Sequence, residues 1–280
     1  MTNPRLVGPV GVAILGSTLL LGACSKSAMQ IDSPDEIYGE SVLHHANERH
    51  EAAISGYREM LDHYPLDSRA EEVELRIAHA HLANNDYPEA IAAFSDFQRM
   101  HPTSTHLPEV EYRLGQAYAE QIDTIDRDQG AAMNAHYRLQ SLLARHPDSE
   151  FATQARSMLL DVRENLAGRE FYIAEFYFER GHYRAGWMRT AKILSQYPET
   201  SAAAGAAKRL AEAALENEDQ RTAVLADAAA LELMPRTGEE EIDPTSRRRL
   251  ASGPAVTDLR IHLRTPPPII DRNPLLDAAG

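Results

Sequence analysis

Twelve histidines give the chain its most obvious capacity for metal chemistry, and several stand close together in the first third of the sequence. His44 and His45 are adjacent, and His79 and His81 are separated by one residue. A zinc site usually needs ligands at i and i+4 on one helix with a carboxylate or cysteine nearby, and no His-Glu-x-x-His motif occurs. The acidic segment 123–128 has the wrong spacing for a calcium-binding EF-hand loop. We therefore expect neither a metal site nor a cofactor.

Groups that could catalyse a reaction are no better arranged. The sequence has no Gly-x-Ser-x-Gly nucleophile elbow and no glycine-rich phosphate loop. Paired acids such as Glu71 and Glu72 fall on an expected helix surface, where a solvated face is the usual outcome. The formal net charge of −14 also argues against nucleic acid as a partner, because phosphate binding needs clustered Lys and Arg. We expect the chain not to be an enzyme, and an exported hydrolase is the least favoured hypothesis.

The only cysteine, Cys24, suggests a covalent role of a different kind. Arg5 precedes an apolar stretch, residues 6–21, which has the layout of a secretory signal peptide and is too short and glycine-broken for a membrane span. The stretch leads into Leu21-Gly22-Ala23-Cys24, which resembles the bacterial lipobox, whose cysteine is lipidated and becomes the new N-terminus. An exported protein with one cysteine cannot form an internal disulfide, so lipidation accounts for this thiol better than an ordinary signal peptide with a chance cysteine.

These features predict a lipoprotein signal peptide over residues 1–23 and a lipidated linker over residues 24–32. Two or more acyl chains, palmitate among them, make membrane attachment stable at about 0.8 kcal/mol per buried methylene. Ser25 stands where Asp tends to signal retention in the inner membrane. We therefore expect a lipid anchor at Cys24 in the outer membrane, on its periplasmic face.

A short motif recurs along the chain, in which Tyr, His or Met precedes Pro, most often with Ser or Thr shortly after it. The helices that this motif delimits would position the side chains of any functional site. Aromatic residues make up only 6% of the chain and alanines are abundant, as in helices packed through small residues. The motif recurs at intervals of roughly 37 to 51 residues, close to the lengths of helical repeats. Its prolines are Pro65, Pro102, Pro147, Pro198 and, more weakly, Pro235. Each predicts a helix that ends before Pro, and each Ser or Thr could cap the next helix.

Counting back from each Pro gives one stripe of residues at helical spacing. Twelve residues before Pro stand small residues, namely Ala53, Ala90, Ala135, Gly186 and Ala223. Eight and five residues before Pro stand mostly larger apolar groups, with Asp227 as the clear exception. Polar turns at Asn85-Asp86-Tyr87 and Gly181-His182-Tyr183 separate the paired helices. The pattern resembles the tetratricopeptide repeat (TPR), a helix–turn–helix unit that must stack on its neighbours to bury its apolar face.

We expect an all-α fold, a TPR-like superhelix of helical hairpins with about five repeats over residues 33–235. The extra length falls in the acidic insertion at 123–128 and in a long helix from about Phe151 to Glu179. Residues 236–280 carry short charge blocks and prolines with little periodicity, so we expect a mostly disordered, flexible tail.

Three segments point to a narrower relationship. They are Asp126-Arg127-Asp128, the helical segment 141–149, and the run Ala174-Glu175-Phe176-Tyr177-Phe178-Glu179-Arg180-Gly181. Together they resemble the BamD (ComL) family of TPR lipoproteins over about residues 31–235. The resemblance implies a non-enzymatic scaffold in the machinery that assembles β-barrel proteins in the outer membrane, the BAM complex.

The resemblance also implies partners. In that family the C-terminal repeats dock onto the periplasmic POTRA region of the barrel-forming protein BamA, and Arg189 falls on the arginine position that helps make this contact. The N-terminal repeats contribute to recognising unfolded outer-membrane proteins, and other BAM lipoproteins share the complex. Stacked TPR hairpins form a concave groove that can bind an extended or helical segment, and Tyr38, Tyr57 and Tyr87 of the N-terminal repeats are candidate residues of this groove.

Plainer interpretations stand beside these. Arg189 could be a solvated surface charge, and aromatic residues at helical spacing are more often core than site. The alternative function is another periplasmic TPR lipoprotein that coordinates cell-envelope or peptidoglycan processes.

Overall fold

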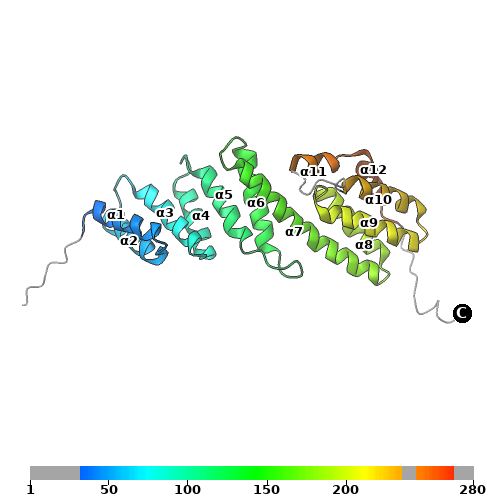
Figure 1. Ribbon diagram of the computed structural model, residues 1–280, viewed down its shortest axis with the longest axis horizontal. Coiled ribbons are helices and arrows are strands. Elements are labelled where there is room, and N and C mark those ends of the chain that lie inside the picture. Colours follow the sequence, from blue (N-terminus) through cyan, green and yellow to red (C-terminus); the bar gives the residue numbers. More distant parts are fainter. Residues whose placement is uncertain (1–31, 235–243, 268–280) are drawn as a thin grey trace, which may run out of the picture. The chain divides into compact units, whose positions relative to one another are not determined.

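The computed structural model describes residues 32–234 and 244–267. Within these residues it contains twelve α-helices and no strand (Figure 1). In chain order the helices are α1 (Pro34–Ala46), α2 (His50–His63), α3 (Ala70–Ala83), α4 (Tyr87–Met100), α5 (Leu107–Ala119), α6 (Gly130–Arg145), α7 (Ala152–Glu179), α8 (Tyr183–Gln196), α9 (Ser201–Glu216), α10 (Gln220–Leu233), α11 (Pro244–Leu250) and α12 (Pro254–His262). They belong to one unit of the chain, which starts at Pro34. The expected signal peptide and all of the expected linker except Asp32 lie in residues 1–31, outside the described residues, and so does Cys24.

From α1 to α10 the helices pack mainly against their neighbours in the chain. The pairs α1–α2, α3–α4, α5–α6, α7–α8 and α9–α10 form hairpins, and each hairpin packs on the next (Figure 1). A hairpin of this size cannot bury its own apolar face, so the stacked neighbours supply the core. The predicted all-α repeat fold is confirmed, and so is the long helix, which is α7.

The proline motif ends the second helix of every hairpin at the same place. Helices α2, α4, α6, α8 and α10 each end two residues before the proline of the motif. The residue between the last helical residue and the proline has non-helical backbone angles, because the proline ring would clash with a helical backbone at that residue. The predicted capping is right only at Thr200, whose hydroxyl accepts from the Ala203 N–H. The serines of the first three motifs do not cap, since α3, α5 and α7 have no side-chain cap.

Four of the five hairpins turn in the same way. Glu48, Asn85, Gly181 and Glu218 have φ between 59° and 73°. The next N–H in each case reaches back five residues to a helix carbonyl, as Asp86 does to His81 at 2.9 Å. This Schellman arrangement satisfies carbonyls at the helix end and reverses the chain tightly. The α5–α6 hairpin differs because the acidic segment 123–128 lies between its helices.

The predicted stripe forms the core of the hairpins. All five small residues twelve before the proline are buried, and so are the residues five before it. Eight before the proline, Tyr57, Phe94, Leu139 and Thr190 are fully buried, whereas Asp227 is exposed. The one predicted irregularity therefore lies on the surface.

The prediction of a mostly disordered tail is wrong for residues 244–267. This segment contains α11 and α12, and α12 packs on α10. Val256, Leu259 and Leu263 of the tail are buried in the core that the alanines of α9 and α10 also build. Three apolar residues at helical spacing are too few for a periodicity to stand out between charge blocks. Residues 236–243 and 268–280 of the expected tail lie outside the described residues.

Candidate docking surfaces

Arg189 lies on α8 and forms an ion pair with α7. Its Nη1 donates to Oε2 of Glu170 at 2.8 Å, and Nζ of Lys192 donates to Oε1 of the same carboxylate at 2.6 Å. Arg189 is therefore not the freely solvated charge of the plainer interpretation. Its side chain is nevertheless 37% exposed, so part of the guanidinium stays open to solvent.

The α7–α8 hairpin positions this cluster by close backbone approach. Gly186 of α8 has no side chain, and Phe178 of α7 fills the space where a Cβ would stand. Arg189 follows Gly186 by three residues and Lys192 by six, so both cations lie near the helix face that meets α7. Glu170 precedes Phe178 by two turns of α7 and therefore meets them.

The electrostatics of Glu170 show that the pairing is favourable. Burial by itself would raise the pKa of this carboxyl, but hydrogen bonds from Lys192 and Arg189 outweigh it and lower the pKa. Two cations share one carboxylate, so the cluster carries one excess positive charge at neutral pH. A guanidinium has five N–H donors, and the pair with Glu170 uses only part of this capacity. The cluster could therefore bind an additional carboxylate.

The three tyrosines proposed for a groove do not form one. Tyr57 is fully buried in the core between α1, α2 and α3, so it cannot line a surface groove. Tyr38 packs at a ring-centroid distance of 6.5 Å from Tyr57 and donates its hydroxyl to Glu72 at 2.7 Å. Tyr87 lies at the start of α4 and donates to Asn85 at 2.9 Å. The structure brings together only Tyr38 and Tyr57.

Two arginines enclose the partly exposed ring of Tyr38. The guanidinium carbons of Arg69 and Arg76 lie 4.9 Å and 5.6 Å from the ring centroid. Burial and the hydrogen bond to Glu72 raise the pKa of the phenol. These contacts join α1 to the start of α3, which makes Tyr38 a structural link between the first two hairpins.

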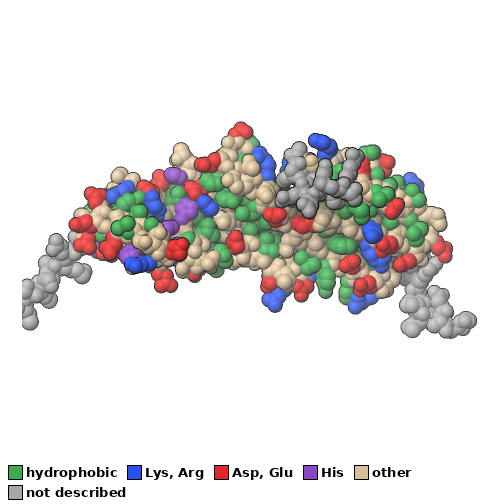
Figure 2. All heavy atoms as spheres, in the orientation of Figure 1, with side chains coloured by type: hydrophobic (Ala, Val, Ile, Leu, Met, Phe, Trp, Pro, Cys, Tyr) green, Lys and Arg blue, Asp and Glu red, His purple; other side chains and the backbone are tan. Residues whose placement is uncertain are grey.

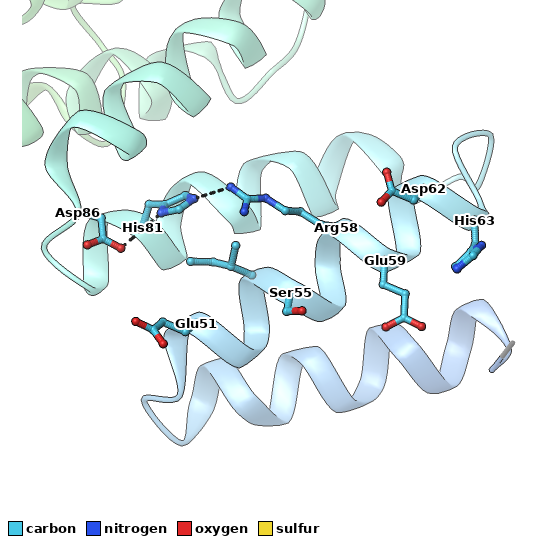
Figure 3. A pocket seen from close by; sticks show the side chains of 9 residues that line it. Glu51, Ser55, Arg58, Glu59, Asp62, His63, His81 and Asp86 are labelled. Carbon is cyan, nitrogen blue, oxygen red and sulfur yellow. Dashed lines mark hydrogen bonds and ion pairs between the residues drawn. The ribbon is translucent and has the colours of Figure 1, made fainter. Parts of the chain in front are cut away.

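A polar pocket of about 470 Å³ opens beside these helices, and the tyrosine prediction missed it. Its lining comes from α2, α3 and the turn after α3, namely Glu51, Ile54, Ser55, Arg58, Glu59, Asp62, His63, His81 and Asp86 (Figure 3). Arg58 reaches across to Nε2 of His81 at 3.2 Å, and Nδ1 of His81 lies 3.6 Å from Asp86. Four carboxylates against one arginine make the pocket acidic. The polar residues at helical spacing on α2 were the signal available in the sequence.

Histidines gather near this pocket without forming a metal centre. Figure 2 shows them among acidic and basic side chains over the N-terminal helices. Within the described part of the chain, no three His, Cys, Asp or Glu side chains are placed to hold a metal ion.

Tyr172 and Phe176 form an exposed aromatic pair on α7, which sequence reasoning also missed. They stand four residues apart on one helix face, with Arg180 3.6 Å from the ring centroid of Phe176. Exposed aromatics beside arginine are enriched at protein interfaces.

Among the described helices, none is long and apolar enough to cross a membrane.

Comparisons with known proteins identify a family and several relatives. The model of the family YfiO, described as "Outer membrane lipoprotein", matches residues 30–226. The Outer membrane protein assembly factor BamD of Caulobacter vibrioides is 36% identical over 98 residues, which cover 35% of this chain and 32% of the relative. The protein of the same name from Vibrio cholerae is 27% identical over 201 residues, or 68% of this chain and 83% of the relative. The chain thus spans about a third of the first relative's length and most of the second's.

Among solved structures, MamA 41-end from Desulfovibrio magneticus RS-1 is similar with a TM-score of 0.37 and 16% identity, covering 72% of this chain and 96% of that one. The family match covers all of α1 to α9 and half of α10. The chain belongs to the YfiO family of outer-membrane lipoproteins.

Proposed function

We propose that this chain is a scaffold subunit of the complex that assembles β-barrel proteins in the outer membrane. The carrying observation is the family match over residues 30–226, which spans the repeat array and both charged surfaces described above. The relatives' name, Outer membrane protein assembly factor, supports the same role. On this proposal the chain binds other proteins and catalyses no reaction.

The Arg189 surface docks the POTRA region of a BamA-like barrel protein. Its excess positive charge calls for a carboxylate on the partner, and the exposed part of the guanidinium can offer two parallel donors. Glu170 holds the Arg189 side chain in place before binding, which reduces the entropy lost on association. Other lipoproteins of the complex bind elsewhere on the array.

The acidic pocket between α2 and α3 contacts unfolded outer-membrane proteins, in place of the buried Tyr57. Four carboxylates and the largely buried Ile54 are part of its lining. Such a lining suits an extended segment that carries a basic side chain next to an apolar one.

Lipidation of Cys24 anchors the scaffold on the periplasmic face of the outer membrane. The expected test is a Cys24→Ala variant, which should leave the membrane fraction and fail to incorporate a labelled palmitate. A variant that stays in the membrane fraction would contradict a lipid anchor.

The first experiment is a mild-detergent pull-down of the lipidated full chain from its own membranes, with partners identified by mass spectrometry. A POTRA-bearing barrel protein as the dominant partner supports the proposal. Recovery of peptidoglycan-linked proteins instead, with normal levels of outer-membrane barrels on depletion, would exclude it.

Arg189→Glu then tests the docking surface. We expect the barrel protein to be lost from the pull-down, whereas the matched control Arg184→Glu on the same helix retains it. Since Arg189 also neutralises Glu170, thermal melting of both variants should show that the fold persists. Arg189→Lys keeps a charge for Glu170 but loses the forked donors, and intermediate binding is expected.

A further inference from the structure

The C-terminal helix α12 forms one wall of a groove that lies partly outside the family match, which ends at residue 226. The other wall is α8. The groove has a volume of about 550 Å³ and is lined by Ala191, Lys192, Ser195, Thr257, Arg260, Ile261, Leu263 and Arg264. Helix α12 lies wholly beyond the residues that the family match covers.

The lining is cationic. Lys192, Arg260 and Arg264 contribute three positive charges and no acid lines the groove. Arg260 and Arg264 are exposed, form no ion pair among the described residues, and stand four residues apart so that they share one side of the helix. Lys192 is paired with Glu170. This concentration of cations contrasts with the net charge of −14 on the whole chain.

The groove also has apolar parts. Ala191 and the buried Leu263 are part of its lining, and Ile261 is 57% exposed. An exposed isoleucine between two arginines is costly in water and gains when a partner covers it. The combination suits a peptide segment in which acidic residues flank an apolar one.

The wall formed by α12 is held in place before any partner binds. Val256 and Leu259 are fully buried, and the Val256 N–H donates to Glu232 at 2.9 Å. At the other end of the helix, Nε2 of His262 lies 2.7 Å from the Thr222 hydroxyl. The arginines are thus presented from a fixed helix rather than from a mobile tail.

We propose that this groove receives an acidic segment of the protein partner that docks at Arg189, which rests on the proposed function. Charge complementarity selects the class of segment, since the exposed Arg260 and Arg264 attract an occupant with carboxylates. Continuity selects the partner: Lys192 lines the groove and shares Glu170 with Arg189, so the two surfaces adjoin on α8. The extension beyond the family match thereby enlarges the interface.

The test compares full-length lipidated variants in membranes. Arg260→Glu with Arg264→Glu should reduce recovery of the POTRA-bearing partner by about tenfold or more, because like charges then meet across the groove. The control Arg248→Glu with Arg249→Glu makes the same charge change at exposed positions of α11 outside the groove. It should leave recovery unchanged, and equal melting temperatures should show that α12 stays folded. Full recovery with the groove variant, while Arg189→Glu abolishes binding, would overturn the groove and leave the proposed function intact.

A photo-crosslinking residue at position 261 identifies the occupant. The expected product joins position 261 to an acidic segment of the POTRA-bearing partner. A crosslink to an anionic lipid, or to residues 268–280 of the same chain, would overturn the proposal. If the wild-type pull-down contains no POTRA-bearing protein, the proposed function fails, and a crosslink from position 261 to a segment of any other protein would overturn the groove proposal as well.

Discussion

Gly186 of α8 lies so close to Phe178 of α7 that a Cβ on the glycine would stand 2.5 Å from Cε1 of the ring. This contact sets the distance between the two helices and with it the meeting of Arg189 and Lys192 with Glu170. A packing requirement in the core thus places the charged groups that we propose to bind the partner.

Gly186→Ala should destabilise the fold by about 1–3 kcal/mol, because the added methyl group overpacks against Phe178. Gly39→Ala is the matched control, since a Cβ at Gly39 of α1 meets nothing within 4 Å. It should be neutral or stabilising by up to about 1 kcal/mol, because alanine favours a helix over glycine. Urea unfolding of both variants checks this, and equal effects would contradict the packing account.

Glu170→Gln should change how stability depends on pH. The folded pKa of Glu170 is lowered from 4.5, so its ion pairs stabilise the fold above that value and are lost as the pH falls through the folded pKa. The variant should be less stable by about 1–2 kcal/mol at pH 7 and lose less stability on acidification. Denaturant unfolding between pH 7 and pH 3 measures both quantities. The control Glu179→Gln, at an exposed residue of the same helix, should change stability at pH 7 by less than about 0.5 kcal/mol.

Leu259→Ala should destabilise the C-terminal core by about 2–5 kcal/mol, as for other fully buried leucines. Ile261→Ala, two residues away on the same helix but exposed, should change stability by less than about 0.5 kcal/mol. Thermal unfolding with limited proteolysis of the tail provides the comparison. Rapid cleavage within residues 254–262 of the wild type would mean that α12 does not pack as described.

Tyr57→Ala should destabilise the N-terminal hairpins by about 3–5 kcal/mol, because it removes a fully buried ring. Tyr87→Ala removes a partly exposed ring that bonds to Asn85, so about 1 kcal/mol or less is expected. Chemical denaturation distinguishes the two. A Tyr57→Ala chain of normal stability that fails to bind substrate would restore Tyr57 as a groove residue.

Much of the fold could be predicted because it depends on local backbone constraints. Proline at positions such as Pro65 and Pro198 excludes a helical residue before it wherever the chain goes. Asn85 and Gly181 tolerate positive φ and so mark where hairpins reverse. These effects act within a few residues.

The helix stripe was equally predictable, since residues four and seven apart share a face whatever they pack against. Helical spacing did not show, however, whether a tyrosine is buried in the core or lines a surface groove. Tyr57 belongs to the stripe and is buried, although it had been a candidate for the groove of the N-terminal repeats.

The sequence by itself determined where the second helix of each hairpin ends, the turns at Asn85 and Gly181, and the buried stripe, because each arises from contacts within one or two turns of the chain. Only the tertiary structure decided that Arg189 pairs with Glu170, that Tyr57 is core, and that α12 packs on α10 to build a basic groove with α8. These relationships join residues far apart in the chain. They depend on which helix faces approach one another, and short-range periodicity carries no information about that.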